Sequence, residues 1–378
     1  MTEKKNLYSM IFIICSSLLL GCKDQETYPN ITHIHSSPTT AKPANVSEVF
    51  EFSFANITLP DSVFFGNIDH IKADDKQLYL FDPSKTRTIT ILDKRGNYVN
   101  QLKRIGNGPG EYTSPFAFDV DTNNDELLVY DRSRLYINTY ELPSLALLGT
   151  QRVDSYLMNF EILDKKKILA VRDDTKDQNR LFGLEIWNRD FEVVKDEISD
   201  MHNAVIELSY PSSIGRSESG VLYAHPFTGL ISSVGESGLT PHLKLNFSRW
   251  EIPKNLYSME DAIPFERALR ENKYMLWPRF PLHINNTFSM WYMFGSDVEN
   301  YQLLVHDLST GKQKNYSEIR LDNSGLKLPM PLGLDNDSYV TLIWPKDIAQ
   351  KHISAEYADV FEKSRTTELP IIVFLKIK

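Results

Sequence analysis

A strand-like segment recurs along the chain at a spacing that few folds can accommodate. Lys76–Asp82 (KQLYLFD) resembles Asp125–Asp131 (DELLVYD), and Lys167–Asp173 (KILAVRD) follows, with steps of 49 and 42 residues. Three looser versions come later: Gly220–His225, Phe288–Phe294 and Asp337–Trp344. Repeats of 40–50 residues are typical of propellers, in which each repeat builds one four-stranded blade. The spacing predicts an all-β fold, a six-bladed β-propeller.

The limits of this propeller are predicted from the strand-like runs at its two ends. Short runs of aromatic and β-branched residues, separated by Asp, Asn and Gly turns, begin near Val49 and continue to the end of the chain. We expect residues 48–378 to form the ring. Val49–Phe54 and Ile371–Ile377 should lie in the same last blade, because ring closure removes the exposed sheet edges that both ends would otherwise leave.

Residues 249–284 interrupt the repeat and are predicted to be an insertion with one short helix over Asp261–Asn272. Aromatic faces beside an arginine can form a platform for a sugar or a peptide. The residues that we single out for such a weak ligand site are Trp250, Tyr274, Trp277 and Arg279. The alternative is that these aromatic side chains only pack the insertion against the blades. We expect the insertion to project from one face of the ring.

The amino terminus has the pattern of an export signal. Lys4 and Lys5 precede the apolar run Met10–Leu20, whose 11 residues are too few to cross a membrane as a helix. The run ends in Leu-Leu-Gly-Cys, which resembles the lipobox of bacterial lipoproteins. That resemblance implies a signal peptide over residues 1–21, lipid attachment at Cys22 and a place in the bacterial outer membrane, on its periplasmic or its outer side. The alternative is an ordinary secretory signal cut nearby.

Residues 22–47 are polar and rich in Pro, Ser and Thr, and we predict that they form a flexible tether. A random coil of 25 residues would span on the order of 25–30 Å. His33 and His35 are then tether residues rather than a metal pair. Lys23–Glu26 (KDQE) is similar to the acidic signals that direct some lipoproteins to the cell surface.

The glycine-rich loop Gly106–Tyr112 (GNGPGEY) has two interpretations, a phosphate cradle or a corner between blades. A phosphate loop needs a Lys-Ser/Thr pair and then a helix, but here Glu111 and a strand-like run follow the glycines. A corner needs glycine only for its backbone freedom. We therefore predict a corner.

Residues 106–131 resemble the NHL-type propeller repeat, in which such a loop joins successive blades. Together with the lipobox, the chain is most similar to the TolB-like six-bladed propeller lipoproteins of bacteria. The resemblance covers residues 65–145 well, and it implies a membrane-anchored propeller.

No motif indicates a cofactor or a metal. Asp119, Asp121, Asn123 and Asp125 have the spacing of a calcium loop, but Tyr130 stands where its last carboxylate ligand belongs, so we predict a turn. The only cysteines are Cys15 and Cys22, which leaves the folded domain without a thiol. A formal net charge of −9 argues against general nucleic-acid binding.

Two function classes follow from these features. The favoured one is an envelope lipoprotein that presents its propeller to a glycan, a peptide or a protein partner. The alternative is a propeller-type hydrolase or lyase with metal ligands gathered from several blades. The side chains that line the central tunnel should distinguish them, since an enzyme of that kind needs acidic or histidine ligands there.

Overall fold

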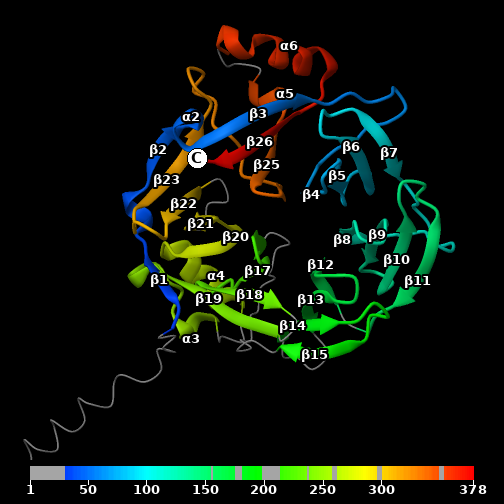
Figure 1. The fold of residues 1–378 in the computed structure, drawn as a ribbon, viewed down its shortest axis with the longest axis horizontal. Coiled ribbons are helices and arrows are strands. Elements are labelled where there is room, and N and C mark those ends of the chain that lie inside the picture. Colours follow the sequence, from blue (N-terminus) through cyan, green and yellow to red (C-terminus); the bar gives the residue numbers. More distant parts are fainter. Residues whose placement is uncertain are drawn as a thin grey trace, which may run out of the picture.

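The computed structural model describes residues 30–154, 156–174, 181–197, 213–235, 238–257, 262–295, 300–348 and 353–378. The strands of these residues form a closed ring around a central axis (Figure 1). They pair into six successive antiparallel units of four strands, which we number from 1 to 6. The predicted all-β propeller fold is confirmed.

Units 1 to 3 each consist of four consecutive strands. Unit 1 contains β4 (His70–Ala73), β5 (Gln77–Asp82), β6 (Thr88–Asp93) and β7 (Tyr98–Leu102). Unit 2 contains β8 (Pro115–Asp121), β9 (Glu126–Asp131), β10 (Tyr136–Glu141) and β11 (Leu147–Arg152). Unit 3 contains β12 (Leu157–Ile162), β13 (Ile168–Asp174), β14 (Leu181–Trp187) and β15 (Val193–Glu197).

Units 4 to 6 continue the pattern, and the last unit takes its outer strand from near the start of the chain. Unit 4 contains β16 (Ile214–Ser217), β17 (Gly220–Ala224), β18 (Leu230–Gly235) and β19 (Gly238–Asn246). Unit 5 contains β20 (Met275–Ile284), β21 (Thr287–Phe294), β22 (Tyr301–Asp307) and β23 (Gln313–Arg320). Unit 6 contains β24 (Gly333–Asp335), β25 (Ser338–Ile343), β26 (Ile371–Ile377) and β3 (Phe50–Asn56).

The predicted ring closure is confirmed by the pairing in unit 6. Strands β26 and β3 run antiparallel in continuous register from Ile371↔Asn56 to Ile377↔Phe50. The inner strands β24 and β4 are also hydrogen-bonded in parallel, at Gly333↔Ile71, so unit 6 joins unit 1 directly. Both ends of the folded ring are therefore held in one unit.

One apolar cluster lies between each pair of neighbouring units, and this accounts for the apolar runs in the repeat. In β9, Leu127 and Val129 pack toward unit 1, whereas Leu128 and Tyr130 pack toward unit 3. Successive side chains of a strand point to opposite faces of its sheet. Because each unit is covered on both faces, its second strand is apolar at most of its central positions.

The six repeated segments of the sequence are the second strands of the six units, β5, β9, β13, β17, β21 and β25. The residue that ends this segment has a structural role. The Asp82 carboxylate accepts hydrogen bonds from the backbone N–H groups of Gly66, Asn67 and Lys85. It thereby joins the loop that enters the unit to the loop after its second strand, and these bonds hold the pKa of Asp82 below its usual value although burial acts in the other direction.

The residue that ends the second strand also accepts backbone hydrogen bonds in units 2 and 4, although its type differs. Asp131 accepts hydrogen bonds from the N–H groups of Thr113, Ser114 and Ser133 in unit 2. In unit 4 the equivalent residue is His225, whose Nδ1 accepts from the N–H groups of the loop that follows it. The sequence repeat thus records a shared hydrogen-bonding position.

The tether prediction is wrong for residues 32–47. Strand β1 (Thr32–His35) pairs in parallel with β19 of unit 4, and β2 (Lys42–Asn45) pairs in parallel with β23 of unit 5. The 3-10 helix η1 (Pro38–Thr40) lies between them, and the helical turn α2 (Val46–Val49) leads into β3. We call residues 32–47 the strap. Its backbone groups pair with those of sheet edges that would otherwise be exposed, and this pairing holds it in place. Only a few of its side chains, such as Ile34 and Val46, are buried.

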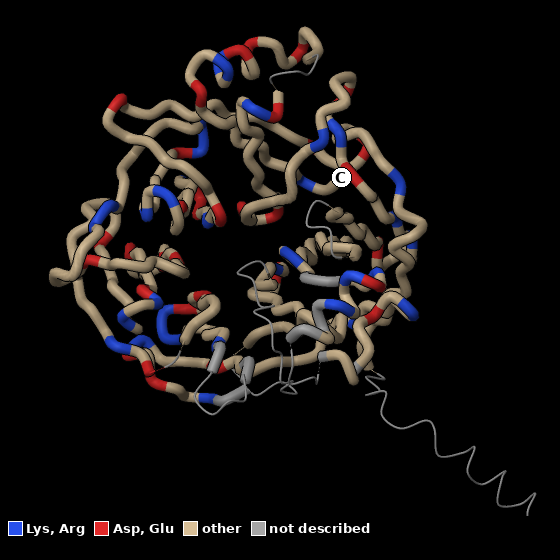
Figure 2. Tube along the Cα trace, turned by 180° about the vertical axis from the view of Figure 1, so that it is seen from behind, with Lys and Arg blue, Asp and Glu red and all other residues tan. Residues whose placement is uncertain are grey.

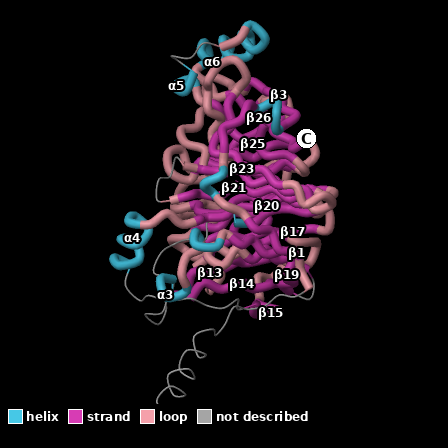
Figure 3. Tube along the Cα trace, turned by 90° about the vertical axis from the view of Figure 1, so that its left-hand side faces the viewer, coloured by secondary structure: helices cyan, strands magenta, loops and turns pink. Residues whose placement is uncertain are grey.

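The insertion is shorter than predicted. Residues 275–284 are not part of it, because they form the inner strand β20 of unit 5. The remainder contains η3 (Ser248–Trp250), α3 (Lys254–Tyr257) and α4 (Ala262–Glu271), and the last matches the predicted helix. Both α3 and α4 project from one face of the ring, as expected (Figure 3).

Further helices were not expected from the sequence. They are α5 (Pro345–Ile348), η4 (Ala355–Tyr357) and α6 (Ala358–Thr367), which together connect β25 to β26. Phe361 of α6 packs on Phe54 of β3, with ring centroids 5.7 Å apart. None of the helices in the described ranges is long and apolar enough to span a bilayer. We call the side of the ring that carries α3, α4 and α5 the helix face (Figure 3).

Candidate functional site: the axial pocket

A pocket lies on the axis of the ring, where the inner strands of five units converge. Its wall comes from β4, β12, β16, β20 and β24, and it leaves about 30 Å³ for solvent. That space corresponds to roughly one or two water molecules. Charged residues of both signs surround the central opening (Figure 2).

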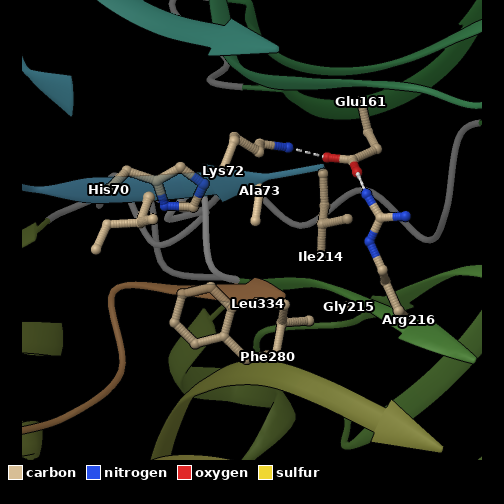
Figure 4. Close-up of a pocket in the computed structure, with 10 residues that line it drawn as sticks. His70, Lys72, Ala73, Glu161, Ile214, Gly215, Arg216, Phe280 and Leu334 are labelled. Carbon is tan, nitrogen blue, oxygen red and sulfur yellow. Dashed lines mark hydrogen bonds and ion pairs between the residues drawn. The ribbon is translucent and has the colours of Figure 1, made fainter. Parts of the chain in front are cut away.

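Four of these charged residues form a chain of ion pairs across four consecutive units. Lys72 of β4 contacts Asp119 of β8 at 3.0 Å and also donates to Glu161 of β12. Glu161 in turn accepts from Arg216 of β16 at 3.2 Å through its other oxygen (Figure 4). The first three side chains are almost fully buried, whereas Arg216 is 47% exposed. The chain of contacts therefore runs from the interior of the ring to solvent.

The pKa shifts in this chain follow from burial and from neighbouring charges. Burial acts to lower the pKa of Lys72, but Asp119 and Glu161 outweigh it and raise that pKa. Burial acts to raise the pKa of Glu161, but Lys72 and Arg216 lower it. For Asp119, burial and the Glu161 charge raise the pKa to about 6, which Lys72 only partly offsets. Asp119 is thus the carboxylate that is held least firmly in its charged form.

His70 lies beside Lys72 on the same face of β4. Its ring stacks on that of Phe280 from β20, with centroids 6.1 Å apart and planes inclined by 18°. Burial, followed by the charges of Lys72 and Arg279, lowers the pKa of His70 to about 3. The imidazole is therefore neutral at physiological pH.

The backbone of β20 is irregular where it reaches the axis. Phe280 has a φ of 49°, and the pairing of β20 with β21 shifts register between Arg279 and Leu282. A bulky residue in this left-handed region is uncommon and costs on the order of 1–3 kcal/mol. The irregular strand directs the Phe280 ring toward His70 in the pocket (Figure 4).

At two places the backbones of neighbouring inner strands approach so closely that no side chain fits between them. A Cβ atom on Gly215 of β16 would collide with the carbonyl oxygen of Pro281 in β20. A Cβ atom on Gly333 of β24 would meet the carbonyl oxygen of Ile71 in β4 in the same way. Glycine is required at both positions because backbone occupies the space of a side chain.

The weak ligand site predicted from the sequence is not the axial pocket. Trp250 is half-buried and packs edge-on against Phe294 of unit 5, with centroids 5.3 Å apart, which is the packing role named as the alternative. Arg279 lies over the ring of Tyr301 at 5.2 Å, and Tyr274 is half-buried just before β20. Among these three described side chains none lines the axial pocket. The side chain of Trp277, like Cys22, lies outside the described part of the chain.

The glycine loop is the corner that the sequence predicted, and it connects β7 of unit 1 to β8 of unit 2. The Gly108 N–H donates to the Glu111 carboxylate at 2.7 Å, so the loop binds its own carboxylate. Gly110 has a φ of 67°, and a Cβ atom on Gly106 would collide with the Glu111 side chain. An external phosphate would have to displace Glu111.

The residues with calcium-loop spacing form a turn, as the sequence predicted. Asp121 accepts hydrogen bonds from the N–H groups of Asn123 and Asn124 in the β8–β9 hairpin. The other early position, Asp119, faces the axis and pairs with Lys72. Across the described residues no three His, Cys, Asp or Glu side chains are grouped so that they could hold a metal ion.

The axial residues were missed by sequence reasoning, although a signal was present. Each is a polar or charged residue in the short first strand of its unit: His70 and Lys72 in HIKA, Asp119 in PFAFDVD, Glu161 in LMNFEI, and Arg216 in IGRS. Aligning the first strands of the repeats, rather than the second strands, would have brought them together.

Comparison with known proteins supports the fold. The crystal structure of a "putative exported protein" from Bacteroides fragilis matches with a TM-score of 0.76 and 18% identity, over 92% of this chain and 100% of that one. A member of the DUF4221 family from Bacteroides vulgatus matches with a TM-score of 0.51 and 11% identity, over 87% of this chain and 98% of that one. At these identities the likeness concerns the fold alone. No curated protein matches the sequence.

A family comparison covers the whole ring. The family described as "Domain of unknown function (DUF4934)" matches residues 42–376, which extend from β2 of the strap to the end of β26. The matched segment therefore contains all the strands that build the axial pocket. The chain belongs to the DUF4934 family.

Proposed function

We propose that this protein is a lipid-anchored envelope protein whose propeller binds a glycan, a peptide or a protein partner. The lipobox ending at Cys22 supports the anchor, and the similarity to TolB-like propeller lipoproteins belongs to the same proposal. The structural neighbour from Bacteroides fragilis, described as exported, is consistent with passage across the inner membrane.

Acidic and histidine side chains do lie at the axis, as the enzyme alternative requires, but the pairing of the axial charges supports the binding role. Both Glu161 oxygens are engaged, one by Lys72 and the other by Arg216, and Asp119 contacts Lys72. Carboxylates held by cations are poor ligands for a metal ion, because the metal would have to displace Lys72. This arrangement favours recognition over the alternative, a metal-dependent hydrolase or lyase.

The strap changes how an anchored propeller would be presented. With β1 paired to unit 4, only nine residues lie between Cys22 and Thr32. A coil of that length spans about 17 Å, compared with 25–30 Å for the longer tether expected from the sequence. A lipid on Cys22 would therefore hold the rim of unit 4 close to the membrane.

Metabolic labelling with an alkyne fatty acid tests the anchor. We expect the label on the wild type and on Cys15→Ala, a matched change inside the signal, but not on Cys22→Ala. Because only Cys22 stands at the lipobox, the Cys22→Ala protein should accumulate as uncleaved precursor. Label on Cys22→Ala would show that the anchor assignment is wrong.

Site-specific photo-cross-linking in cells tests the binding role. A photoreactive residue at Arg267, exposed on α4 of the helix face, should form a discrete adduct. The matched position is Lys165, exposed in the β12–β13 turn on the opposite face, where we expect no adduct. Discrete adducts at neither position, across cells grown on different glycan sources, would contradict a binding role for the helix face.

A further inference from the structure

We propose that the axial pocket binds a carboxylate group, held by Lys72, Arg216 and His70. This inference names the chemical class that the proposed binding protein recognises, and in that sense it rests on the proposed function. The ligand would be a small carboxylic acid or the carboxylate of a larger molecule.

The first argument is the supply of unused donors on the two cations. Lys72 carries three N–H donors, and its contacts to Asp119 and Glu161 account for two of them. Arg216 has five donors, reaches Glu161 with one nitrogen and is half exposed. Both side chains line the pocket together with Glu161 (Figure 4). An oxyanion in the pocket would meet donors of both residues.

The second argument is His70. Its side chain lies in the pocket wall and its residue is 91% buried, and no hydrogen bond to its imidazole occurs among the residues that the structure describes. A ring nitrogen of a pocket-lining histidine that has no partner among these residues is available to a ligand or to water. As a neutral ring beside two cations, His70 can donate one N–H to an oxyanion without adding charge.

The third argument is the balance of charge. Lys72 and Arg216 are the cations of the ion-pair chain, and Asp119 and Glu161 are its carboxylates. These four charges cancel, so a bound monoanion would leave the group with one negative charge unless a carboxylate takes up a proton. If the anion adds repulsion, Asp119 can take up a proton more readily than Glu161, because its pKa is already raised.

The fourth argument is size. The free space of about 30 Å³ leaves room for a group about as large as the tip of a carboxylate. The flat rings of His70 and Phe280 bound this space on one side. A planar group is therefore the better fit.

Acetate is the probe, and its binding to the purified chain from residue 23 onward is measured by saturation-transfer NMR at constant ionic strength. We expect saturable binding to the wild type. Arg216→Ala should weaken it about tenfold or more, the usual effect of losing a charge-assisted hydrogen bond. His70→Phe retains the stacked ring and loses the nitrogens, so it should also weaken binding.

Arg320→Ala is the matched control, because Arg320 is 48% exposed and forms a similar pair with Glu318 away from the axis. Its acetate affinity should equal that of the wild type, and thermal midpoints should show that all variants fold. Absence of saturable binding, or equal affinities of Arg216→Ala, His70→Phe and the wild type, would overturn the proposal. Tighter binding of inorganic phosphate than of acetate would show that carboxylate is the wrong class.

The outcomes separate this inference from the proposed function. If acetate does not bind while Cys22 is lipidated and Arg267 forms adducts, the axial site is rejected and the anchored binding role stands. If acetate binds as expected while both of those tests fail, the axial site stands and the envelope role is rejected.

Discussion

The glycine loop and the axial pocket invite comparison, because both present donors to an anion but only one leaves them available. In the loop, the Gly108 N–H is taken by Glu111 of the same loop, three residues along the chain. In the pocket, Lys72 and Arg216 come from different units. Their N–H donors outnumber the contacts that they make to Asp119 and Glu161. The loop is a complete structural element, whereas the pocket retains capacity for a ligand.

The difference shows that a glycine-rich motif indicates an anion site only if its N–H donors are not already paired within the protein. Glycines allow a chain to wrap around an anion, and here the anion is part of the chain. The ion-pair chain at the axis has no motif, since its residues are single positions in four separate repeats. Changes in the loop should therefore affect stability alone, and changes at the axis should affect binding as well.

The largest effect is expected from Tyr112→Ala at the end of the loop. Tyr112 is buried, and its hydroxyl hydrogen-bonds to the carbonyl oxygens of Arg87 and Leu102. Loss of a buried aromatic side chain should lower the free energy of unfolding by about 3–5 kcal/mol. Urea unfolding measures this change, and Tyr112→Phe should cost only about 1 kcal/mol. A weaker acetate affinity in a folded Tyr112→Phe protein would contradict the separation of loop and pocket.

Lys72→Met should have the next largest effect. It leaves the Asp119 and Glu161 carboxylates buried without the cation between them, for which we expect a loss of about 3 kcal/mol at pH 7. Acetate binding should disappear. The loss of stability should be smaller at pH 5, where Asp119 can be protonated. An equal loss at both pH values would show that the two carboxylates do not interact.

Asp119→Asn sharpens the comparison through pH. The folded pKa of Asp119 is raised from 3.8 to about 6, so its protonated form stabilises the fold at low pH, and this contribution is lost as pH rises from about 4 to about 6. The asparagine variant lacks that loss. Its stability relative to the wild type should therefore increase by about 2 kcal/mol between pH 4 and pH 6.5, since one unit of pKa corresponds to about 1.4 kcal/mol. Parallel urea titrations of the two proteins test this, and a constant difference between them would contradict it.

The smallest effect is expected from Glu111→Ala. It removes the carboxylate that accepts from Gly108, and the expected loss of stability is about 1 kcal/mol, measured by urea unfolding. Acetate affinity should not change. If stability stays at the wild-type value, Glu111 does not contribute to the corner, and the loop resembles the pocket more than we propose.

Much of the ring could be predicted from the sequence, because its signals are local. The apolar second strands, the aspartates at Asp82 and Asp131, and the glycine corner each depend on residues close together in the chain. The helix α4 was also visible as a periodic segment. The helix α6 was not, since only a few of its residues, such as Phe361, are buried against β3.

The strap and the site required the tertiary structure. Residues 32–47 are polar and rich in turn formers, and only the free edges of β19 and β23, about 200 and 270 residues away, make them strands. The sequence by itself determined the repeat, the six second strands and the glycine corner, because each depends on residues that are close together in the chain. Closure of the ring decided that Lys72, Asp119, Glu161 and Arg216 meet, because an axis brings together residues from separate repeats, whatever the distance between them along the chain.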